Sequence, residues 1–576
     1  MRTIDVEVLV VGIGPSGLAA AGFLSKYDVN VLAISKYAAP APTPRATVAN
    51  ARSIEIYRDL GCEKEVQAVG VPLPKIYNNV FATSFAGLEI GRYKSYGVPP
   101  ERQSDYALAS PCSGWNVPQH RLEPVLLKTA RGYGADVRYS NEMLHIEQTA
   151  DEVRARILDK DSGEEYDVRA RYVVAADGGR SPTAEIFGVE FQGEEAYGDI
   201  VSMWVEADLE KYTAYRPGLI YSILQPGRHQ FGGGWLCVRC WDEWLVSVAG
   251  ATSETPESEL LERAYKTIGD PDVKIRIKQT YSWKVNHLYA CEYRKGRVFL
   301  AGDAAHRHPP SGGLGANTSM QDSFNLAWKL AYVLKGKAGD GLLDSYHQER
   351  QPVGRHVVER ANASLRNQRT VTKALSLQGL KEKELDKGWQ ILENFFADTP
   401  EAAERRANFS EAIKLGNYRS NAIGVELGQR YTSCAVVSDG TPFPEYTRDP
   451  DLYYHRTTHP GAYVPHAWVL QGKKQISMID ITGKGRFSLI IGLSGKGWAS
   501  AAAKASAELG IDIAILSIGP NCEYNDIYAE WAGVREVSEQ GALLVRPDRH
   551  IAWRSAGGVD SPDKVLLAAL RQVLAR

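Results

Sequence analysis

Cysteine is scarce in this chain, and neither sign of charge is in excess. The 576 residues include seven cysteines at irregular spacing, and an odd, scattered set is not a disulfide framework. We therefore expect a reducing compartment, the cytoplasm. Lys and Arg total 67 against 69 for Asp and Glu, so the chain has no overall positive field to hold a nucleic-acid backbone. We expect no nucleic-acid partner.

Long hydrophobic runs are also missing. No apolar stretch reaches the roughly 20 residues that a membrane-spanning helix needs, and the N-terminus lacks a basic segment with a cleavage site. We expect neither a membrane anchor nor an export signal. The 44% hydrophobic and 24% charged residues are typical of a globular enzyme, and the length predicts two or three domains.

A strand, a glycine-rich turn and a helix begin the chain. Val6–Val11 is an almost continuous apolar run, and Gly12, Gly14 and Gly17 follow it before a helical stretch and a second strand at Val31–Ile34. This is the order and size, about 30 residues, of a dinucleotide-binding βαβ unit. The first glycine permits a tight turn, the second lets the backbone approach a pyrophosphate, and the third lets helix and strand pack closely. A merely structural turn is the alternative.

The second strand ends at Ser35 and Lys36, where dinucleotide folds usually carry an acidic residue for the ribose hydroxyls. Ser35 can still hydrogen-bond a ribose weakly. The turn therefore does not distinguish NAD from FAD.

Later segments change pattern. Short runs rich in Trp, Tyr, Val and Ile predict an antiparallel sheet, after which an apolar strand and a long helix resume the first pattern. The predicted parts are a discontinuous first domain at 1–190 and 285–364, a sheet domain at 191–284 with part of 70–115, a helical connector at 365–420, and a smaller α/β domain at 421–576.

Two further motifs carry a family resemblance. Asp177 and Arg180 lie in YVVAADGGRS at 172–181, and Asp303 lies in GDAAHRHPPSGGLGAN at 302–317. With the N-terminal glycines, they resemble the three fingerprints of the FAD-dependent aromatic hydroxylases, the group A flavoprotein monooxygenases. APTPR at 41–45 and EIYRDLG at 55–61 are similar to the branch with 2,4-dichlorophenol 6-monooxygenase, 2-hydroxybiphenyl 3-monooxygenase and phenol hydroxylase.

The resemblance implies an α/β fold: a Rossmann-like FAD-binding domain, an interleaved antiparallel-sheet substrate domain and a thioredoxin-like C-terminal domain. It also implies that NADPH or NADH reduces FAD, and that O2 reacts through a C4a-hydroperoxyflavin to hydroxylate a phenol or aromatic polyketide. A homodimer is the implied assembly. Epoxidation or dehydrogenation of an aromatic metabolite is the alternative reaction.

The resemblance also implies which residues contact FAD. A helix starting near Gly315 would point unpaired N–H groups and its positive dipole end at the flavin. The expected cofactor contacts are Gly12, Gly14, Ser16, Gly17, Ser35, Lys36, Arg45, Gln119, Asp177, Asp303, Gly313, Leu314, Gly315 and Asn317, with Arg180 as a further phosphate contact.

The sequence departs from the related branch at two pocket positions. Thr47 replaces a histidine and cannot act as a base near neutral pH, which leaves proton relay or packing open. The loop His308–Ser311 also departs, since relatives commonly carry a methionine near Ser311. We expect Thr47, His308 and Pro310 to take part in catalysis, and Tyr221, Arg239 and Ser311 to contact the substrate. A structural role is the alternative for each.

Cys237 and Cys240 have the two-residue spacing of redox and metal motifs. Side chains alternate along a strand, so we expect the two sulfurs to point apart. No second ligand pair accompanies them, and we predict no metal site.

Overall fold

The computed structural model describes residues 2–227, 231–248 and 250–576. A mostly parallel sheet forms around the predicted first strand. β1 (Arg2–Val11) pairs in parallel with β2 (Val31–Ile34) on one side and with β11 (Glu165–Ala175) on the other. β8 (Asp136–Arg138), β18 (Val298–Leu300) and β17 (Arg294–Lys295) extend it in the order β17-β18-β11-β1-β2-β8, and β10 (Val153–Asp159) and β9 (Asn141–Gln148) add an antiparallel flap.

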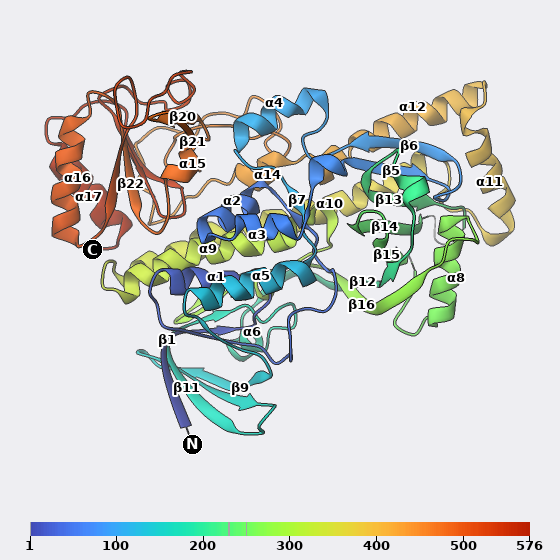
Figure 1. Cartoon of the computed structure of the whole chain (residues 1–576), viewed down its shortest axis with the longest axis horizontal. Coiled ribbons are helices and arrows are strands. Elements are labelled where there is room, and N and C mark those ends of the chain that lie inside the picture. The colour runs from blue at the N-terminus through green and yellow to red at the C-terminus, as the bar shows by residue number, and fades with distance from the viewer. Residues whose placement is uncertain (1, 228–230, 249) are drawn as a thin grey trace.

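One face of this sheet is covered by helices. α1 (Pro15–Lys26) packs between α5 (Gln119–Gly132) and α9 (Leu314–Leu334), which crosses the centre of the molecule (Figure 1). α9 is buried along nearly all its length. Its buried polar side chains, such as Asn317, Asp322 and Lys329, have hydrogen-bond partners within the protein. The predicted strand, glycine turn, helix and strand are confirmed.

The second large sheet is the predicted antiparallel one. Its order is β19-β16-β12-β15-β14-β13-β5-β6, and only β13 and β5 pair in parallel. The strands are β5 (Asn78–Ala82), β6 (Glu89–Lys94), β12 (Phe191–Glu206), β13 (Gly218–Leu224), β14 (Phe231–Arg239), β15 (Glu243–Val248), β16 (Arg276–Ala290) and β19 (His306–Arg307). α8 (Glu257–Ile268) covers one face of this sheet.

The segment 365–420 is largely helical, as predicted. α10 (Asp344–Ala374) runs through position 364 without a break, so the first domain and the connector share one long helix. α11 (Leu385–Glu393) and α12 (Pro400–Lys414) follow. Phe409 of α12 packs edge-on against Phe81 of β5, with ring centroids 5.7 Å apart, and so ties the connector to the second sheet.

The C-terminal part has its own four-stranded sheet, in the order β23-β22-β24-β25. β22 (Phe487–Ile491) is parallel to β23 (Ile513–Ser517) and antiparallel to β24 (Ala542–Val545), which pairs with β25 (Ile551–Ser555). α16 (Lys496–Leu509) and α17 (Pro562–Val573) pack side by side (Figure 1). The predicted alternation of strand and helix is confirmed.

Buried ion pairs join this C-terminal sheet to α9 and α10. Glu349 accepts hydrogen bonds from Lys329 at 2.7 Å and from Arg546 at 2.5 and 2.8 Å, and Arg546 also pairs with Asp548. The side chains of all four are at most 1% exposed. Because an unpaired charge is costly to bury, the four must stay together. We call them the junction cluster.

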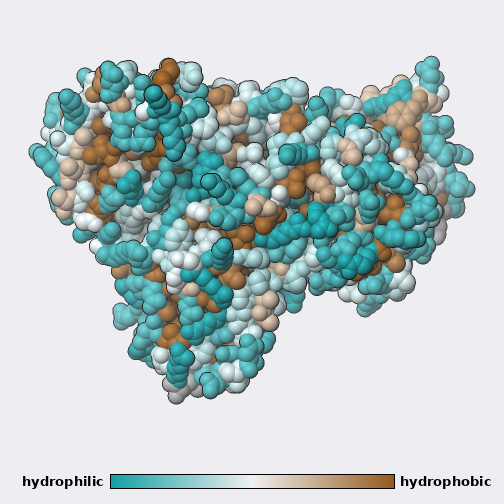
Figure 2. Space-filling view, viewed as in Figure 1, coloured by the Kyte–Doolittle hydropathy of each residue, from teal (hydrophilic) through white to brown (hydrophobic). Residues whose placement is uncertain are grey.

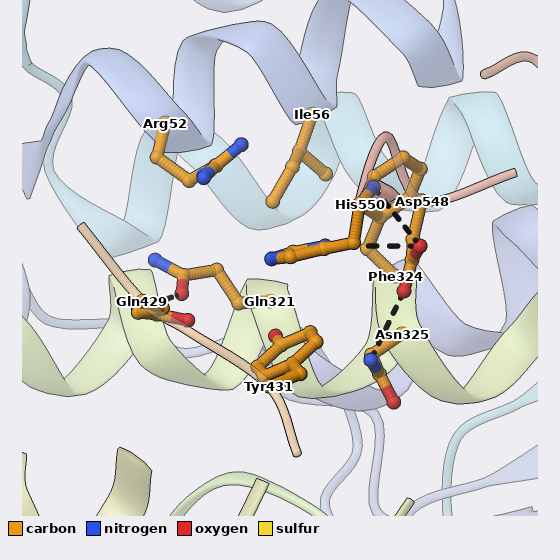
Figure 3. A pocket seen from close by; sticks show the side chains of 9 residues that line it. All are labelled: Arg52, Ile56, Gln321, Phe324, Asn325, Gln429, Tyr431, Asp548 and His550. Carbon is orange, nitrogen blue, oxygen red and sulfur yellow. Dashed lines mark hydrogen bonds and ion pairs between the residues drawn. The ribbon is translucent and has the colours of Figure 1, made fainter. Parts of the chain in front are cut away.

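A small cavity lies beside the junction cluster, between α2 (Ala51–Leu60), α9 and the loop after β24. Its volume of about 10 Å³ holds about one water molecule. Figure 3 shows Asn325 of α9 hydrogen-bonded to Asp548, and His550 between Arg52 and Tyr431. The cavity is too small for an aromatic substrate.

The face seen in Figure 2 is mostly hydrophilic, with hydrophobic residues in small separate groups. Among the described residues, no helix combines the length and the apolar character needed to cross a membrane.

Candidate active site

The turn before α1 leaves room for a bound group at one glycine only. A Cβ on Gly12 (φ +94°) would lie 2.2 Å from the carbonyl oxygen of Ala176, and one on Gly17 would lie 1.9 Å from that of Gly12. A Cβ on Gly14 would meet no atom within 4 Å, and no side chain caps the N-terminus of α1 there. Unpaired N–H groups facing open space fit a pyrophosphate.

The N-terminus of α9 is likewise uncapped by any side chain. Gly312 (φ +87°) and Gly313 (φ +65°) turn the chain into the helix in conformations that favour glycine. A Cβ on Gly313 would lie 2.8 Å from Cβ of Val48, so the loop 45–48 sits directly on this turn. Leu314 is buried against α10.

Asn317 joins these two loops through its own side chain. Its Oδ1 accepts from the backbone N–H of Asn50 at 2.9 Å and from Ser53 Oγ at 2.6 Å, and its Nδ2 donates to the carbonyl of Val48 at 2.8 Å and to that of Gly313. The amide is therefore fully used within the protein. The side chain of Asn317 thus positions the two loops, and the expected contact of Asn317 with FAD stays a prediction.

The side-chain hydroxyl of Ser16 is likewise hydrogen-bonded within the protein. Its Oγ lies 3.0 Å from Ser323 Oγ on α9, so only its backbone N–H faces the turn. At the end of β2, Ser35 Oγ accepts from the N–H of Tyr37 at 3.2 Å, and Lys36 is exposed. Both lie at the carboxyl end of the parallel sheet, where dinucleotide folds bind ligands.

Only one of the two carboxylate oxygens of Asp177 accepts a hydrogen bond among the described residues. Oδ2 accepts from the N–H of Thr183 at 3.1 Å, whereas Oδ1 is buried with no partner among the described residues. A buried oxygen without a partner points to a missing ligand group. Asp303 is exposed, as is Arg180. Both motifs therefore present polar groups that the protein itself does not satisfy.

Glu123 holds the loop that carries Arg45 and was missed from the sequence. Its carboxylate accepts from Gln119 Nε2 at 2.6 Å and from the N–H of Ala41 at 2.5 Å. The N–H of Gln119 donates to the carbonyl of Ala46. Gln119 and Glu123, both on α5, thus hold the loop that carries Arg45, and the Arg45 side chain is exposed.

The three expected catalytic residues lie on the two loops that Asn317 joins. Thr47 is buried, Pro310 is exposed, and the carbonyl of Pro310 accepts from the N–H of Gly313. His308 Nδ1 lies 2.8 Å from the carbonyl of Pro309, and its Nε2 is buried without a partner among the described residues. A Cβ on Gly315 would lie 3.5 Å from that ring, so His308 stands beside the start of α9. Burial lowers the pKa of His308 to about 4, which keeps the ring neutral.

The structure does not bring Tyr221 and Arg239 to these loops. Tyr221 neighbours Trp235 in the row of residues that faces α8, and its hydroxyl donates to the carbonyl of Arg216 at 2.8 Å. Arg239 forms a two-bonded ion pair with Asp242 at the end of β14. Tyr221 thus lies on the α8 face of the sheet and Arg239 at its edge, and their expected contacts with substrate stay predictions. Ser311 is buried on the loop beside His308.

The opposite face of the second sheet carries residues that we did not predict from the sequence. Ser222, Ser247, Ser202 and Tyr281 lie near one row across the strands, one position along from the row of Tyr221. The positive charge of Arg45 reaches Tyr281, whose pKa burial raises to about 12 and Arg45 partly lowers again. The Arg45 loop therefore faces this row. Ser202 is buried, and Ser222, Ser247 and Tyr281 are half-buried. Serine has no local sequence signal for a substrate-facing position, so the sequence did not identify this row.

The two thiols of the Cys-x-x-Cys segment do not point apart as predicted. Sγ of Cys237 lies 3.8 Å from Sγ of Cys240. The pairing of β14 with β15 shifts register after Cys237, and the strand ends at Arg239. The irregularity and the turn return the second sulfur to the side of the first.

Family comparison agrees with this geometry. A family model described as "FAD binding domain" matches residues 5–361, and one described as "Aromatic-ring hydroxylase, C-terminal" matches residues 457–576. The chain belongs to the FAD-dependent aromatic-ring hydroxylases. The hydroxylase therefore uses FAD as its cofactor, and the open turn at Gly14 and the unsatisfied oxygen of Asp177 fit that group.

Relatives of this hydroxylase include enzymes for small and large aromatic compounds. It is 42% identical to 2,4-dichlorophenol 6-monooxygenase of Delftia acidovorans, over 99% of this chain and 98% of that protein. It is 39% identical to phenol 2-monooxygenase of Pseudomonas sp. (strain EST1001), over 99% and 93%. The solved flavin-dependent monooxygenase PieE, in complex with FAD and substrate, matches with a TM-score of 0.95 and 41% identity over both full chains. Aklavinone-11 hydroxylase with FAD and aklavinone matches at 0.81 and 29%, also over both full chains.

Proposed function

We propose that this hydroxylase adds one oxygen atom of O2 to a phenolic ring held between the second sheet and the loop His308–Leu314. The supporting observation is the row of Ser222, Ser247, Ser202 and Tyr281. This row faces the Arg45 loop, on the side of the second sheet away from α8. The names of the relatives include a phenol, a chlorinated phenol and polyketides such as aklavinone and the tetracenomycins. A phenol-bearing substrate is the class these have in common.

FAD, when bound, supplies the redox chemistry that activates O2, with electrons taken from NADPH or NADH. On the proposed assignment, the N–H groups at Gly14 would hold its pyrophosphate, and Ser35 and Lys36 would contact the adenosine. Asp177, Asp303, Arg45 and Gln119 would bind its polar groups. The N–H groups and positive dipole end at the start of α9, Gly313 to Gly315, would stabilise negative charge on the flavin.

We propose that His308 accepts the hydrogen bond of the substrate hydroxyl. A carbonyl only accepts, so the contact with Pro309 assigns the ring proton to Nδ1 and leaves Nε2 as a buried acceptor without a partner. A phenol that donates to Nε2 gains electron density on its ring, which favours attack on an electrophilic oxygen. Thr47 and Ser311 then shape the pocket rather than remove the proton.

The remaining assignments are also proposals. The order β23-β22-β24-β25, with one parallel and two antiparallel pairs and helices after β22 and β25, supports a thioredoxin-like C-terminal domain. The domain limits follow the sheets, with α10 shared between the first domain and the connector. A homodimer and a cytoplasmic location stay predictions.

The test is anaerobic reduction of the purified holoenzyme by NADPH or NADH, with and without 2,4-dichlorophenol, phenol or a phenolic polyketide, followed by mixing with ¹⁸O2. We expect one ligand class to accelerate reduction and to gain a single ¹⁸O atom. Replacing His308 by Gln keeps an acceptor and should retain more hydroxylation than His308→Ala. Reduction that ignores every ligand, with no labelled product, would refute the hydroxylation of phenols.

A further inference from the structure

We propose that Cys237 and Cys240 form a peroxide-responsive dithiol that closes to a disulfide behind the substrate-facing sheet. The geometry carries this inference. Their sulfurs lie 3.8 Å apart, whereas a disulfide needs about 2.05 Å, so a local movement of roughly 2 Å joins them. All seven cysteines lie in the described part of the chain and are free of disulfides, Cys237 and Cys240 included.

The two thiols have different surroundings. Cys237 is completely buried, whereas Cys240 is partly exposed beside Trp241. The hydrogen bond from Cys237 lowers the pKa of Cys240 and raises that of Cys237. The thiolate is the nucleophilic form of cysteine, so Cys240 is the sulfur that attacks the oxidant, and Cys237 then forms the disulfide with it.

The chemistry balances with hydrogen peroxide as the oxidant. The Cys240 thiolate attacks one peroxide oxygen, an S–O bond forms, the O–O bond breaks, and the departing hydroxide takes up a proton to become water. The sulfur of Cys237 then attacks that of Cys240, the S–S bond forms, and the oxygen leaves with the Cys237 proton as a second water. Two thiols are oxidised by two electrons, and both peroxide oxygens are reduced to water.

A direct contact links the dithiol to the pocket. The carbonyl of Cys237 accepts from Asn116 Nδ2 at 3.0 Å. Asn116 pairs with Val48, and the next residue, Val117, donates its N–H to the carbonyl of Thr47. A movement of Cys237 therefore shifts Thr47 through the side chain of Asn116 and the backbone hydrogen bonds of residues 116 and 117. The proposal rests on the proposed function in two respects only: the effect of the disulfide on activity, and the enzyme itself as a source of hydrogen peroxide.

The disulfide can be tested without any substrate. Holoenzyme is treated with graded hydrogen peroxide, alkylated and digested with trypsin, which cleaves after Arg239 and separates the two cysteines. We expect a linked pair of peptides that dithiothreitol separates. In Cys237→Ser, Cys240 should progress to sulfinic acid, and in Cys240→Ser, Cys237 should stay reduced. Cys434→Ser, at an exposed thiol, is the matched control and should still form the link.

Two results would overturn the proposal. If Cys240 of the unaltered protein is over-oxidised as readily as in Cys237→Ser, Cys237 does not resolve it. If the link forms but the KM for the phenol is the same before and after oxidation, the coupling through Asn116 is refuted. We expect KM to rise several-fold on oxidation and to return with dithiothreitol, and to stay constant in Cys240→Ser.

Discussion

The carboxylate of Asp322, on α9, accepts a hydrogen bond of 3.1 Å from the backbone N–H of Gly302 in the flavin motif. The same oxygen lies 2.8 Å from His306 Nε2, and the other accepts from Arg350 Nε at 2.8 Å. All three side chains are fully buried. Burial alone would raise the pKa of Asp322, but Arg350 and then His306 hold it below its usual value. A buried anion thus fixes the turn that presents Asp303.

Replacing Asp322 by Asn should weaken FAD binding. The amide leaves Arg350 without its charge partner, and losing one partner of a buried pair costs about 3–5 kcal/mol. We expect a lower melting temperature and about tenfold weaker FAD binding, measured by flavin fluorescence during titration of apoprotein. Tyr332→Phe, at the other end of the same helix, removes a hydroxyl that donates to the carbonyl of Gly485 and is the control. Equal FAD affinity in both variants would contradict the positioning role.

Gly14 and Gly17 should respond differently to alanine. The Cβ of Gly17→Ala would collide with the carbonyl oxygen of Gly12, so this variant should misfold or lose stability. Gly14→Ala has open space and an ordinary φ of −70°, so its apoprotein should melt normally while FAD binding falls at least tenfold. Thermal melts with and without FAD separate the two effects. Normal FAD binding by Gly14→Ala would show that the pyrophosphate lies elsewhere.

Tyr281 and Tyr221 test which face of the second sheet meets the substrate. Tyr281→Phe removes a hydroxyl from the face near Arg45, and we expect a KM several times higher with the melting temperature unchanged. Tyr221→Phe removes the bond to the carbonyl of Arg216 and should cost about 1 kcal/mol with KM unchanged. Steady-state kinetics and denaturant unfolding measure the two quantities. The reverse pattern would place the substrate on the α8 side.

Glu426 should make the protein less stable as pH rises. It lies on α14 (Ile423–Leu427), and burial raises its pKa to about 8. Between the ordinary pKa near 4.5 and about 8, the unfolded chain releases this proton while the folded protein keeps it, so stability falls with increasing pH. Glu426→Gln should remove this pH dependence, and the free energy of unfolding at pH 8 should rise by on the order of 4 kcal/mol. Glu404→Gln, at an exposed carboxylate, should not change the pH dependence of unfolding.

The sequence predicted the elements whose signal is local. The apolar run before Gly12, the alternating segments between 191 and 284 and the α/β alternation after 421 all correspond to observed elements. Contacts between distant segments left no such signal. The residues around Asn317 do not indicate that its side-chain amide hydrogen-bonds Asn50 and Val48. Likewise, the residues around Tyr221 do not indicate that it faces α8. Both contacts depend on how separate elements pack. The Cys237–Cys240 contact was missed because a register shift breaks the alternation that we assumed.

The junction cluster limits how this protein can be recombined with its relatives. Glu349 and Lys329 belong to the segment that matches the FAD-binding model, whereas Arg546 and Asp548 belong to the segment that matches the C-terminal one. A chimera that exchanges the C-terminal segment combines charges from two different proteins at a site where all four side chains are buried. Successful exchange therefore requires a donor with complementary residues at all four positions, and the two segments are constrained to evolve as a pair.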